Sequence, residues 1–323
     1  MNKSPVVPRF ERVIVTGSIA YDHIMSMPGK FSDHIMPDKI HMLNVSFFME
    51  SLRKEFGGTG GNVAYSLALL GTKTVLSGAV GDDFGPYGQH LRKVENLDVA
   101  GIKTFGKLAT AQGFVMTDRD DNQIWGFYTG ALRETAKVKI DKFLKRGVLL
   151  VVAPNDVAAS MKYVKAAIKK GVPYMLDPAF NIPHFSVADL KLAVSGAEIV
   201  IGNDYEMELI KRRFKNSDLR TKNEQIRITT LGAKGSVIEQ AGKKIKVRAA
   251  KVKKVVDPTG AGDAYRAGFV AGYVEGRTLD VCGQMGSVVA AYTVEKLGTQ
   301  THHMTKGGFT QRYGQNFGEG LRL

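Results

Sequence analysis

An acid that directly follows a glycine-rich turn is the pattern in this sequence best suited to chemistry. It lies in the segment DPTGAGDAYRAGF at 257–269, where Gly260 and Gly262 permit steep backbone geometry. The small residues that follow at helical spacing predict a helix that begins near Gly262. Since the first amides of a helix are unpaired and carry partial positive charge, Gly260, Ala261 and Gly262 form a candidate anion hole.

Asp263 comes directly after this candidate anion hole. Its simplest role is that of a favourable acid in the first turn of a helix. The alternative role is catalytic, because phosphoryl transfer to an alcohol needs a group that takes the hydroxyl proton beside donors that stabilise the transferring phosphoryl group. The short motif alone leaves both roles open.

A second glycine-rich turn precedes another expected helix, in FGGTGGNVAYSLALLG at 56–71. Gly57 and Gly58 could form a tight strand-to-helix turn, or they could leave bare backbone against a small polar ligand. Asn62 could cap the helix or donate a side-chain hydrogen bond to that ligand.

Asn203 and Glu206 lie three residues apart at the start of a further expected helix, in GNDYEMEL, and therefore share one face. They could form a capping box, in which each side chain accepts a hydrogen bond from the backbone amide of the other residue. They could instead hold Mg²⁺ and its waters beside phosphate groups, since magnesium prefers oxygen ligands.

Other glycine motifs are weaker. Thr230, Gly232 and Gly235 in TTLGAKGS form a turn after a strand, and their backbone could contact a nucleotide. Gly101–Lys107 has the GxxxxGK spacing of a phosphate loop, but Leu108 stands where the Mg²⁺-binding Ser or Thr is needed, so we reject it. No GxGxxG motif is complete, so we expect no dinucleotide site of the Rossmann type.

Strand and helix patterns alternate along most of the chain, which predicts an α/β fold with a mostly parallel sheet covered on both faces. The irregular segment 20–55 and the hairpin pattern 111–128 around Asp120-Asp121-Asn122 break this rhythm and could form a small second β-layer. Part of the polar, glycine-rich segment 305–323 is expected to be loose. We expect strands at 13–18, 75–80, 148–153, 173–177, 198–201 and 226–230, a β-rich run at 236–249, and helices at 62–70, 84–95, 156–170, 186–195, 204–213, 261–275 and 280–296.

The composition is that of a globular protein. The chain has 323 residues, of which 44% are hydrophobic and 24% charged, enough for one large α/β domain or two smaller ones. The single cysteine, Cys282, excludes a disulfide within the chain and fits a reducing compartment. We find no apolar run of membrane-spanning length and no signal-peptide pattern, so we expect a cytoplasmic protein without a membrane partner.

The formal net charge of +14 allows two interpretations, nucleic-acid binding or a basic surface that suits anionic small molecules. The basic residues are spread along the chain, except at 243–254, where apolar and charged residues alternate as in a half-solvated strand. Without zinc-ligand spacing or an RNA-recognition signature, we expect no nucleic-acid partner.

Taken together and in this order, the motifs resemble those of the ribokinase-like (PfkB) carbohydrate kinase family. The resemblance extends over about residues 12–303. It implies a three-layer α/β/α sandwich with a mostly parallel central sheet and a small β-sheet lid. We expect residues 1–323 to form a single kinase domain, with a lid built from about 20–55 and 108–130. The matching motifs are Gly57-Gly58 with Asn62, Asn203 to Glu206, Thr230-Leu231-Gly232 to Gly235, and the whole of DPTGAGDAYRAGF.

The resemblance also implies roles for single residues. Asp263 resembles the catalytic base of the family, and the three residues before it resemble the anion hole. Asn203 and Glu206 resemble the pair that organises Mg²⁺, through water, and phosphate. The expected contacts to the nucleotide are Asn203, Thr230, Gly232 and Gly235.

On the acceptor side, Asp22 resembles the early acid that binds substrate hydroxyls, beside Gly57, Gly58 and Asn62. Asp257 and Thr259 match positions that bind a monovalent cation in some members of the family. The implied cofactors are therefore Mg²⁺, with ATP as co-substrate, and K⁺ as a candidate activator.

The segments FSDHIMPDKIHMLNVSFFMESLRKEFGG, DDNQIWGFYTGA and GTQTHH are similar to the adenosine or nucleoside kinase branch of bacteria and archaea. Phe114 and Trp125, together with Tyr21, Met36 and Phe127, could stack a purine, or they could be the core of the lid itself. We therefore expect ATP-dependent phosphorylation of the primary 5′-hydroxyl of a ribonucleoside, with adenosine first.

Two alternatives stay open. One is a sugar kinase of the same family, acting on ribose, fructose or a sugar phosphate. The other, from a different class, is an inactive nucleotide-binding regulator. The sequence is compatible with a monomer or a homodimer.

Overall fold

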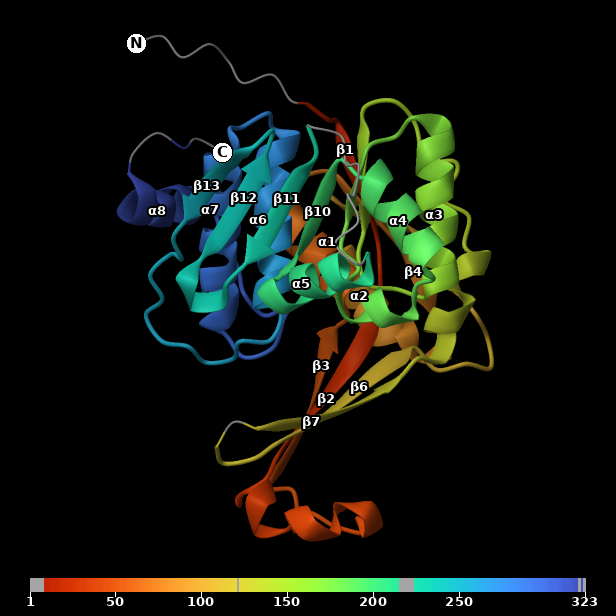
Figure 1. Ribbon diagram of the computed structural model, residues 1–323, viewed down its shortest axis with the longest axis vertical. Helices are drawn as coiled ribbons and strands as arrows, with labels where there is room; N and C mark the ends of the chain where they lie inside the picture. Colours follow the sequence, from red (N-terminus) through yellow and green to blue (C-terminus); the bar gives the residue numbers. More distant parts are fainter. Residues whose placement is uncertain (1–8, 121, 215–223, 319–320, 322–323) are drawn as a thin grey trace.

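The computed structural model describes residues 9–120, 122–214, 224–318 and 321, and within these ranges nine strands form the central sheet (Figure 1). The strand order is β13-β12-β11-β10-β9-β8-β1-β4-β5. β12 pairs antiparallel with β11 and β13, and the other neighbours pair parallel. The strands are β1 (Arg12–Thr16), β4 (Thr74–Val80), β5 (Leu97–Thr104), β8 (Val148–Val152), β9 (Tyr174–Leu176), β10 (Ile199–Asn203), β11 (Ile226–Thr230), β12 (Ser236–Gln240) and β13 (Lys243–Val247).

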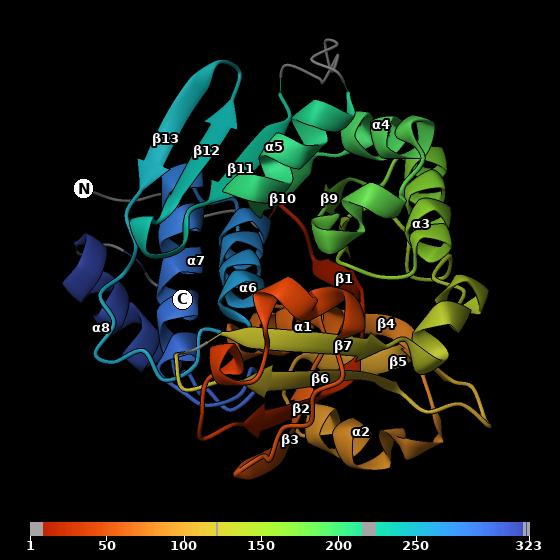
Figure 2. The same cartoon turned by 60° about the horizontal axis from the view of Figure 1, so that its bottom comes forward.

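Helices cover both faces of this sheet (Figure 2). In β1, Val13 and Val15 belong to one buried cluster and Ile14 to the other, because successive side chains of a strand point to opposite faces. The predicted three-layer α/β/α fold is therefore confirmed. One face carries α1 (Thr59–Leu69), α2 (Gly85–Arg92), α6 (Ala261–Val274), α7 (Leu279–Val294) and α8 (Lys306–Phe317), and the other carries α3 (Val157–Lys170), α4 (Val187–Gly196) and α5 (Asp204–Arg213).

A second sheet projects from the body as a lid (Figure 1). Its order is β3-β2-β6-β7, with β2 parallel to β6 and the other pairs antiparallel. The expected small β-layer and the 111–128 hairpin are confirmed, while residue 121 of the turn lies outside the described residues. The strands are β2 (Ala20–Ser26), β3 (Ser51–Gly57), β6 (Ala111–Thr117) and β7 (Gln123–Tyr128), and short 3-10 turns, Phe31–Asp33 and Pro37–Met42, lie between β2 and β3.

Close packing of α6 on α7 explains the small residues after Asp263. A Cβ atom added to Gly268 would lie 2.6 Å from the carbonyl oxygen of Met285, and one added to Gly286 would lie 2.7 Å from that of Tyr265. The two backbones are therefore in contact, and this contact fixes the position of the α6 N-terminus.

Two segments differ from the expectation. Residues 97–104, including Gly101 of the rejected phosphate-loop pattern, form edge strand β5. Within the segment 305–323, part of which was expected to be loose, residues 306–317 form helix α8, because Phe309 and Tyr313, four residues apart, are buried in the core cluster that contains α7. None of the helices in the described ranges has both the length and the hydropathy of a membrane span.

Candidate active site

The predicted anion hole lies at the N-terminus of α6. Gly260 is the N-cap, with a φ of 76° that favours glycine, and the side chain of Thr299 lies 2.8 Å from where its Cβ would be. The amide of Ala261 donates to the carbonyl oxygen of Pro258, at 3.2 Å. The next two amides, of Gly262 and Asp263, belong to the first helical turn, whose N–H groups have no acceptor within the helix. The turn can therefore offer these two donors to an anion.

Asp263 is bound by Asn62 of α1, whose Nδ2 donates to Oδ2 of the aspartate at 2.8 Å. Asn62 does not cap α1, because the N-cap is Gly58. Its Oδ1 accepts from Thr299 Oγ1 at 2.8 Å and from Gln300 Nε2 at 2.9 Å. These two donors orient the amide so that its Nδ2 faces the carboxylate.

Burial raises the pKa of Asp263 to about 6, while Arg266 and the hydrogen bond from Asn62 act in the opposite direction. A carboxylate of this kind is a stronger base than an ordinary aspartate and is still mostly ionised at neutral pH. The position and charge of Asp263 are therefore compatible with a general base.

Asp22 lies on β2 and packs against bare backbone. A Cβ on Gly57 would lie 2.0 Å from Asp22 Oδ2, and one on Gly113 would lie 2.7 Å from Oδ1. Burial raises the pKa of Asp22 to about 7, and repulsion from Asp263 and Asp257 adds to this shift. Gly57 thus makes room for the carboxylate, whereas Gly58, with a φ of 85°, forms the tight strand-to-helix turn.

Trp125 shares the lid face of Asp22. Trp125 pairs with Val115 of β6, and Gly113 of the same strand pairs with Asp22. Because Val115 and Gly113 are two residues apart, their partners lie on one face. The Trp125 ring lies 3.3 Å from the Cβ position of Gly113. Its side chain is not core, since 47% of the residue is exposed.

Phe114 follows Gly113 directly in β6, and successive side chains of a strand point to opposite faces. Phe114 therefore lies on the lid face opposite to Asp22. It stacks on His23, with ring centroids 4.7 Å apart. The structure therefore does not bring Phe114 to Asp22. Tyr21, with 1% exposed, is a core residue, and its hydroxyl donates to the carbonyl oxygen of Asp83.

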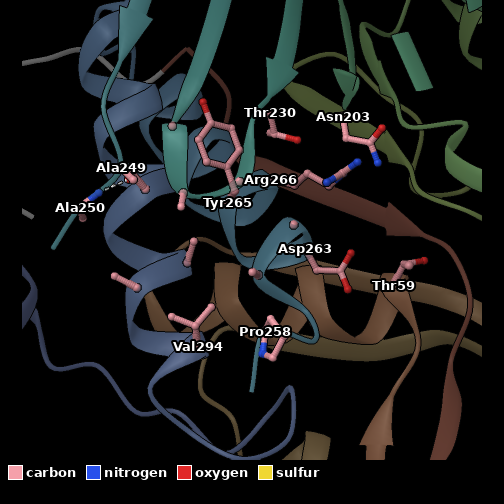
Figure 3. Close-up of a pocket in the computed structure, with 18 of the residues that line it drawn as sticks. Thr59, Asn203, Thr230, Ala249, Ala250, Pro258, Asp263, Tyr265, Arg266 and Val294 are labelled. Carbon is pink, nitrogen blue, oxygen red and sulfur yellow. Dashed lines mark hydrogen bonds between the residues drawn. The ribbon is translucent and has the colours of Figure 1, made fainter. Parts of the chain in front are cut away.

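A cavity of about 590 Å³ opens beside Asp263 and extends toward β10, β11 and α7 (Figure 3). The predicted catalytic residues and the predicted nucleotide contacts meet at this cavity. Of the predicted residues, its walls include Ala261, Gly262, Asp263, Asn203, Glu206, Thr230, Gly232 and Gly235.

Asn203 and Glu206 form a capping box and also line this cavity. Asn203 Oδ1 accepts from the amide of Glu206, and Glu206 Oε2 accepts from the amide of Asn203, both at 2.8 Å. Among the described residues no group of three or more His, Cys, Asp or Glu could hold a metal ion. The pair fits a Mg²⁺ ion held mainly by water and phosphate oxygens, because Glu206 Oε1 has no hydrogen-bond partner among the described residues.

The TLGxxG motif contributes open backbone. Gly232, with a φ of 57°, has nothing within 4 Å of its Cβ position, so its backbone lies bare at the cavity. Gly235 is required by packing, since its Cβ would lie 2.0 Å from the carbonyl oxygen of Val247. Thr230 Oγ1 donates weakly to the carbonyl oxygen of Gly202, at 3.4 Å.

Asp257 joins two loops. Its Oδ1 accepts from the amide of Thr259 at 2.9 Å, and its Oδ2 accepts from the amide of Gly298 at 3.0 Å. This contact holds the turn before α6 against the loop that carries Thr299 and Gln300. K⁺ binding by Asp257 and Thr259 stays a prediction.

Sequence reasoning missed the pair of Arg266 and Asp177. Arg266 Nε lies 2.5 Å from Asp177 Oδ2, and Nη2 donates to Oδ1 at 2.9 Å. Both residues line the cavity. They are 89 positions apart in the chain, and no short motif joins them.

Comparison with known proteins shows the family of the chain. The model of the pfkB family of carbohydrate kinases matches residues 19–306. A nucleoside kinase of Methanocaldococcus jannaschii is 31% identical over 298 residues, which are 91% of this chain and 94% of that protein. A nucleoside kinase of Methanothermobacter thermautotrophicus is 32% identical over 311 residues, 95% of this chain and 96% of that protein.

A solved structure of Burkholderia thailandensis nucleoside kinase in complex with inosine is similar, with a TM-score of 0.86 and 29% identity. The match covers 96% of this chain and 100% of the chain of the Burkholderia thailandensis kinase. Because the family model and the relatives cover nearly the whole length, the chain belongs to the pfkB family of carbohydrate kinases and is an ATP-dependent kinase that acts on a hydroxyl group.

Proposed function

We propose that this kinase phosphorylates the primary 5′-hydroxyl of a ribonucleoside, with adenosine as the first candidate. The observation that carries the proposal is the hydrogen bond between Asn62 and Asp263, which joins the lid side of the site to the cavity. Relatives support the choice of acceptor. The two archaeal relatives are nucleoside kinases, and the Burkholderia thailandensis nucleoside kinase was solved in complex with inosine.

In this proposal ATP occupies the cavity with its γ-phosphate at the N-terminus of α6, and the nucleoside lies beneath the lid. Asp263 accepts the proton of the 5′-hydroxyl as the hydroxyl oxygen bonds to the γ-phosphorus and the bond to the ADP oxygen breaks. The amides of Gly262 and Asp263 stabilise the phosphoryl oxygens. When bound, Mg²⁺ supplies positive charge to the phosphates, and Asn203 and Glu206 would hold its water ligands.

Asp22 would accept hydrogen bonds from the ribose hydroxyls, with Gly57 and Gly58 close by. Trp125, half-exposed on the same face, would stack the base. Phe114 is left out of this acceptor site, because it lies on the other face of the lid.

The proposal includes a single kinase unit over residues 1–323 and a cytoplasmic location, where ATP and Mg²⁺ are abundant. Activation by K⁺ through Asp257 and Thr259 is also part of it, since the loop they fix carries the N-cap of α6.

The test is ATP consumption with Mg²⁺ and K⁺ against adenosine, inosine, cytidine, ribose, fructose and fructose 6-phosphate. Turnover that depends on adenosine or inosine supports the proposal. Turnover with a sugar or sugar phosphate alone would keep the phosphoryl-transfer mechanism and refute the nucleoside acceptor. ATP binding without turnover of any acceptor would favour the regulator.

A further inference from the structure

Arg266 holds a special position in the cavity. Among the described residues that line it, Arg266 is the one permanent cation, and three carboxylates face it, those of Asp177, Glu206 and Asp263. Its guanidinium extends between Asn203 and Asp263 (Figure 3). In the proposed reaction, a cation in this place lies beside the phosphate groups of ATP.

Asp177 holds the guanidinium through a hydrogen bond from Nη2 to Oδ1 and an ion pair between Nε and Oδ2, although Nε makes no hydrogen bond within the described residues. The side chains of the pair are 8% and 2% exposed, so the arrangement is rigid and largely shielded from water. Glu206 Oε2 is further away, 4.0 Å from Nη2.

The third nitrogen, Nη1, has no hydrogen-bond partner in the described part of the chain. It lies 2.9 Å from the position that a Cβ of Gly262 would occupy, directly against the first turn of α6. Since Gly262 has no side chain, nothing from this residue covers Nη1. Nη1 therefore lies beside the turn that carries the amides of Gly262 and Asp263.

A purely structural ion pair is the simpler explanation, but it does not account for this geometry. Buried ion pairs stabilise folds little, because desolvation offsets the Coulomb attraction. A purely structural role also does not explain why Nη1 lies unpaired against the first turn of α6.

We propose that Arg266 is a catalytic residue, whose Nη1 donates a hydrogen bond to the phosphoryl group during transfer. The inference rests on the proposed reaction. As the acceptor oxygen bonds to phosphorus, its proton passes to Asp263 and the electrons of the broken bond pass to the ADP oxygen. Arg266 stays protonated throughout and stabilises the charge on the transferring group.

Arg312 offers a matched control. It also forms a two-point contact with a carboxylate, through Nη1 and Nη2 to Glu295 at 2.8 and 2.7 Å, and it is 13% exposed. It lies outside the 590 Å³ cavity. Arg266→Lys and Arg312→Lys each replace a guanidinium that contacts a carboxylate through two nitrogens by a single ammonium group. The first change is made at the cavity and the second outside it.

The experiment compares kcat, the KM for ATP, slow ATP hydrolysis with water as acceptor, and the midpoint of thermal unfolding. We expect Arg266→Lys to lower kcat and hydrolysis by about 100-fold or more, with the KM for ATP within about threefold. Arg312→Lys is expected to change neither rate by more than about threefold, whatever it does to thermal stability.

A binding measurement covers the case in which a variant is unstable at the assay temperature. ADP binding, and binding of ADP with aluminium fluoride, are measured by calorimetry below the unfolding range. We expect Arg266→Lys to keep its ADP affinity and to lose affinity for the fluoride complex, which mimics the transferring group.

The inference is overturned if Arg266→Lys retains kcat and hydrolysis, or if it loses ADP and fluoride-complex affinity equally, as a structural defect would. Failure of the proposed function looks different. In that case no nucleoside supports turnover in the wild type, while the effect of Arg266→Lys on ATP hydrolysis is still measured.

Discussion

Groups from distant parts of the chain hold Asp263 in place. Asn62 comes from α1, while Thr299 and Gln300, which orient its amide, come from the loop after α7. Tyr87 continues the network, because it contacts Gln300 and donates to the carbonyl oxygen of Gly57 at the end of lid strand β3. Asp263, the proposed base, is thus connected to the lid through hydrogen bonds.

The raised pKa of Asp263 predicts the pH dependence of catalysis. A base acts only when ionised, so kcat/KM should fall as the pH drops through about 6, where burial places the pKa of this carboxyl. An ordinary aspartate would lose activity only near pH 4. The measurement is a pH–rate profile with saturating ATP. A plateau that extends down to pH 4.5 would contradict the assignment.

Glu206→Gln tests the magnesium role against the capping role. Glutamine keeps an oxygen that can accept from the amide of Asn203, so α5 should stay intact, while the negative charge is lost. We expect the Mg²⁺ concentration for half-maximal activity to rise about tenfold.

Asp204→Asn is the control, because this residue also begins α5 but lies outside the cavity. If both variants show the wild-type Mg²⁺ dependence, Glu206 acts as a capping residue alone.

At the residue scale, the sequence identifies a site residue when its neighbours in space are also its neighbours in the chain, as for Asp263 and the turn before it. It does not identify pairs that only the fold brings together. Arg266 meets Asp177 across 89 positions, and Gln300 meets Asn62 across 238. Neither contact has a local spacing that would predict it.

At the scale of elements, the lid positions Asp22 through glycines. Gly57→Ala would place a Cβ 2.0 Å from Asp22 Oδ2 and so displace the carboxylate. We expect the KM for the acceptor to rise at least about tenfold, with the KM for ATP unchanged.

Gly126→Ala is the matched control on β7, since its Cβ would have no neighbour within 4 Å. Steady-state kinetics with both substrates distinguish the two variants. Equal acceptor KM values would show that Asp22 does not bind the acceptor.

The contact between α6 and α7 predicts a stability effect. Gly268→Ala places a Cβ 2.6 Å from the carbonyl oxygen of Met285, so we expect the free energy of unfolding to fall by about 1–3 kcal/mol. Gly314→Ala in α8 has open space and should raise it by up to about 1 kcal/mol. Urea denaturation measures both. If Gly268→Ala is as stable as wild type, the helices are not in backbone contact.

Elements with a clear period could be predicted, because buried parallel strands and amphipathic helices have distinct patterns. Strand β5 was not predicted, because it is an edge strand with many exposed residues and lacks the apolar pattern of a buried strand. Its Gly101 also begins the GxxxxGK spacing of a phosphate loop. Helix α8 was missed because glycine and polar residues dominate it, while two aromatics provide its packing.

At the scale of the whole molecule, charge is distributed unevenly. The chain carries a formal net charge of +14, yet the described lining of the cavity contains three carboxylates and one arginine. The net positive charge can attract ATP over a distance, and the carboxylates of the cavity are the reason why the proposed phosphate site includes a metal ion. The same distribution makes a small anionic substrate a better match than nucleic acid.

The central claim is that Asp263 is the base that activates a nucleoside hydroxyl. Its most direct test is a single-turnover measurement with wild type and Asp263→Asn, using ATP, Mg²⁺ and adenosine at pH 8. We predict that wild type forms the nucleoside 5′-monophosphate, and that the variant binds ATP normally but transfers at least about 1,000-fold more slowly. Transfer by Asp263→Asn at a rate near that of wild type would contradict the account.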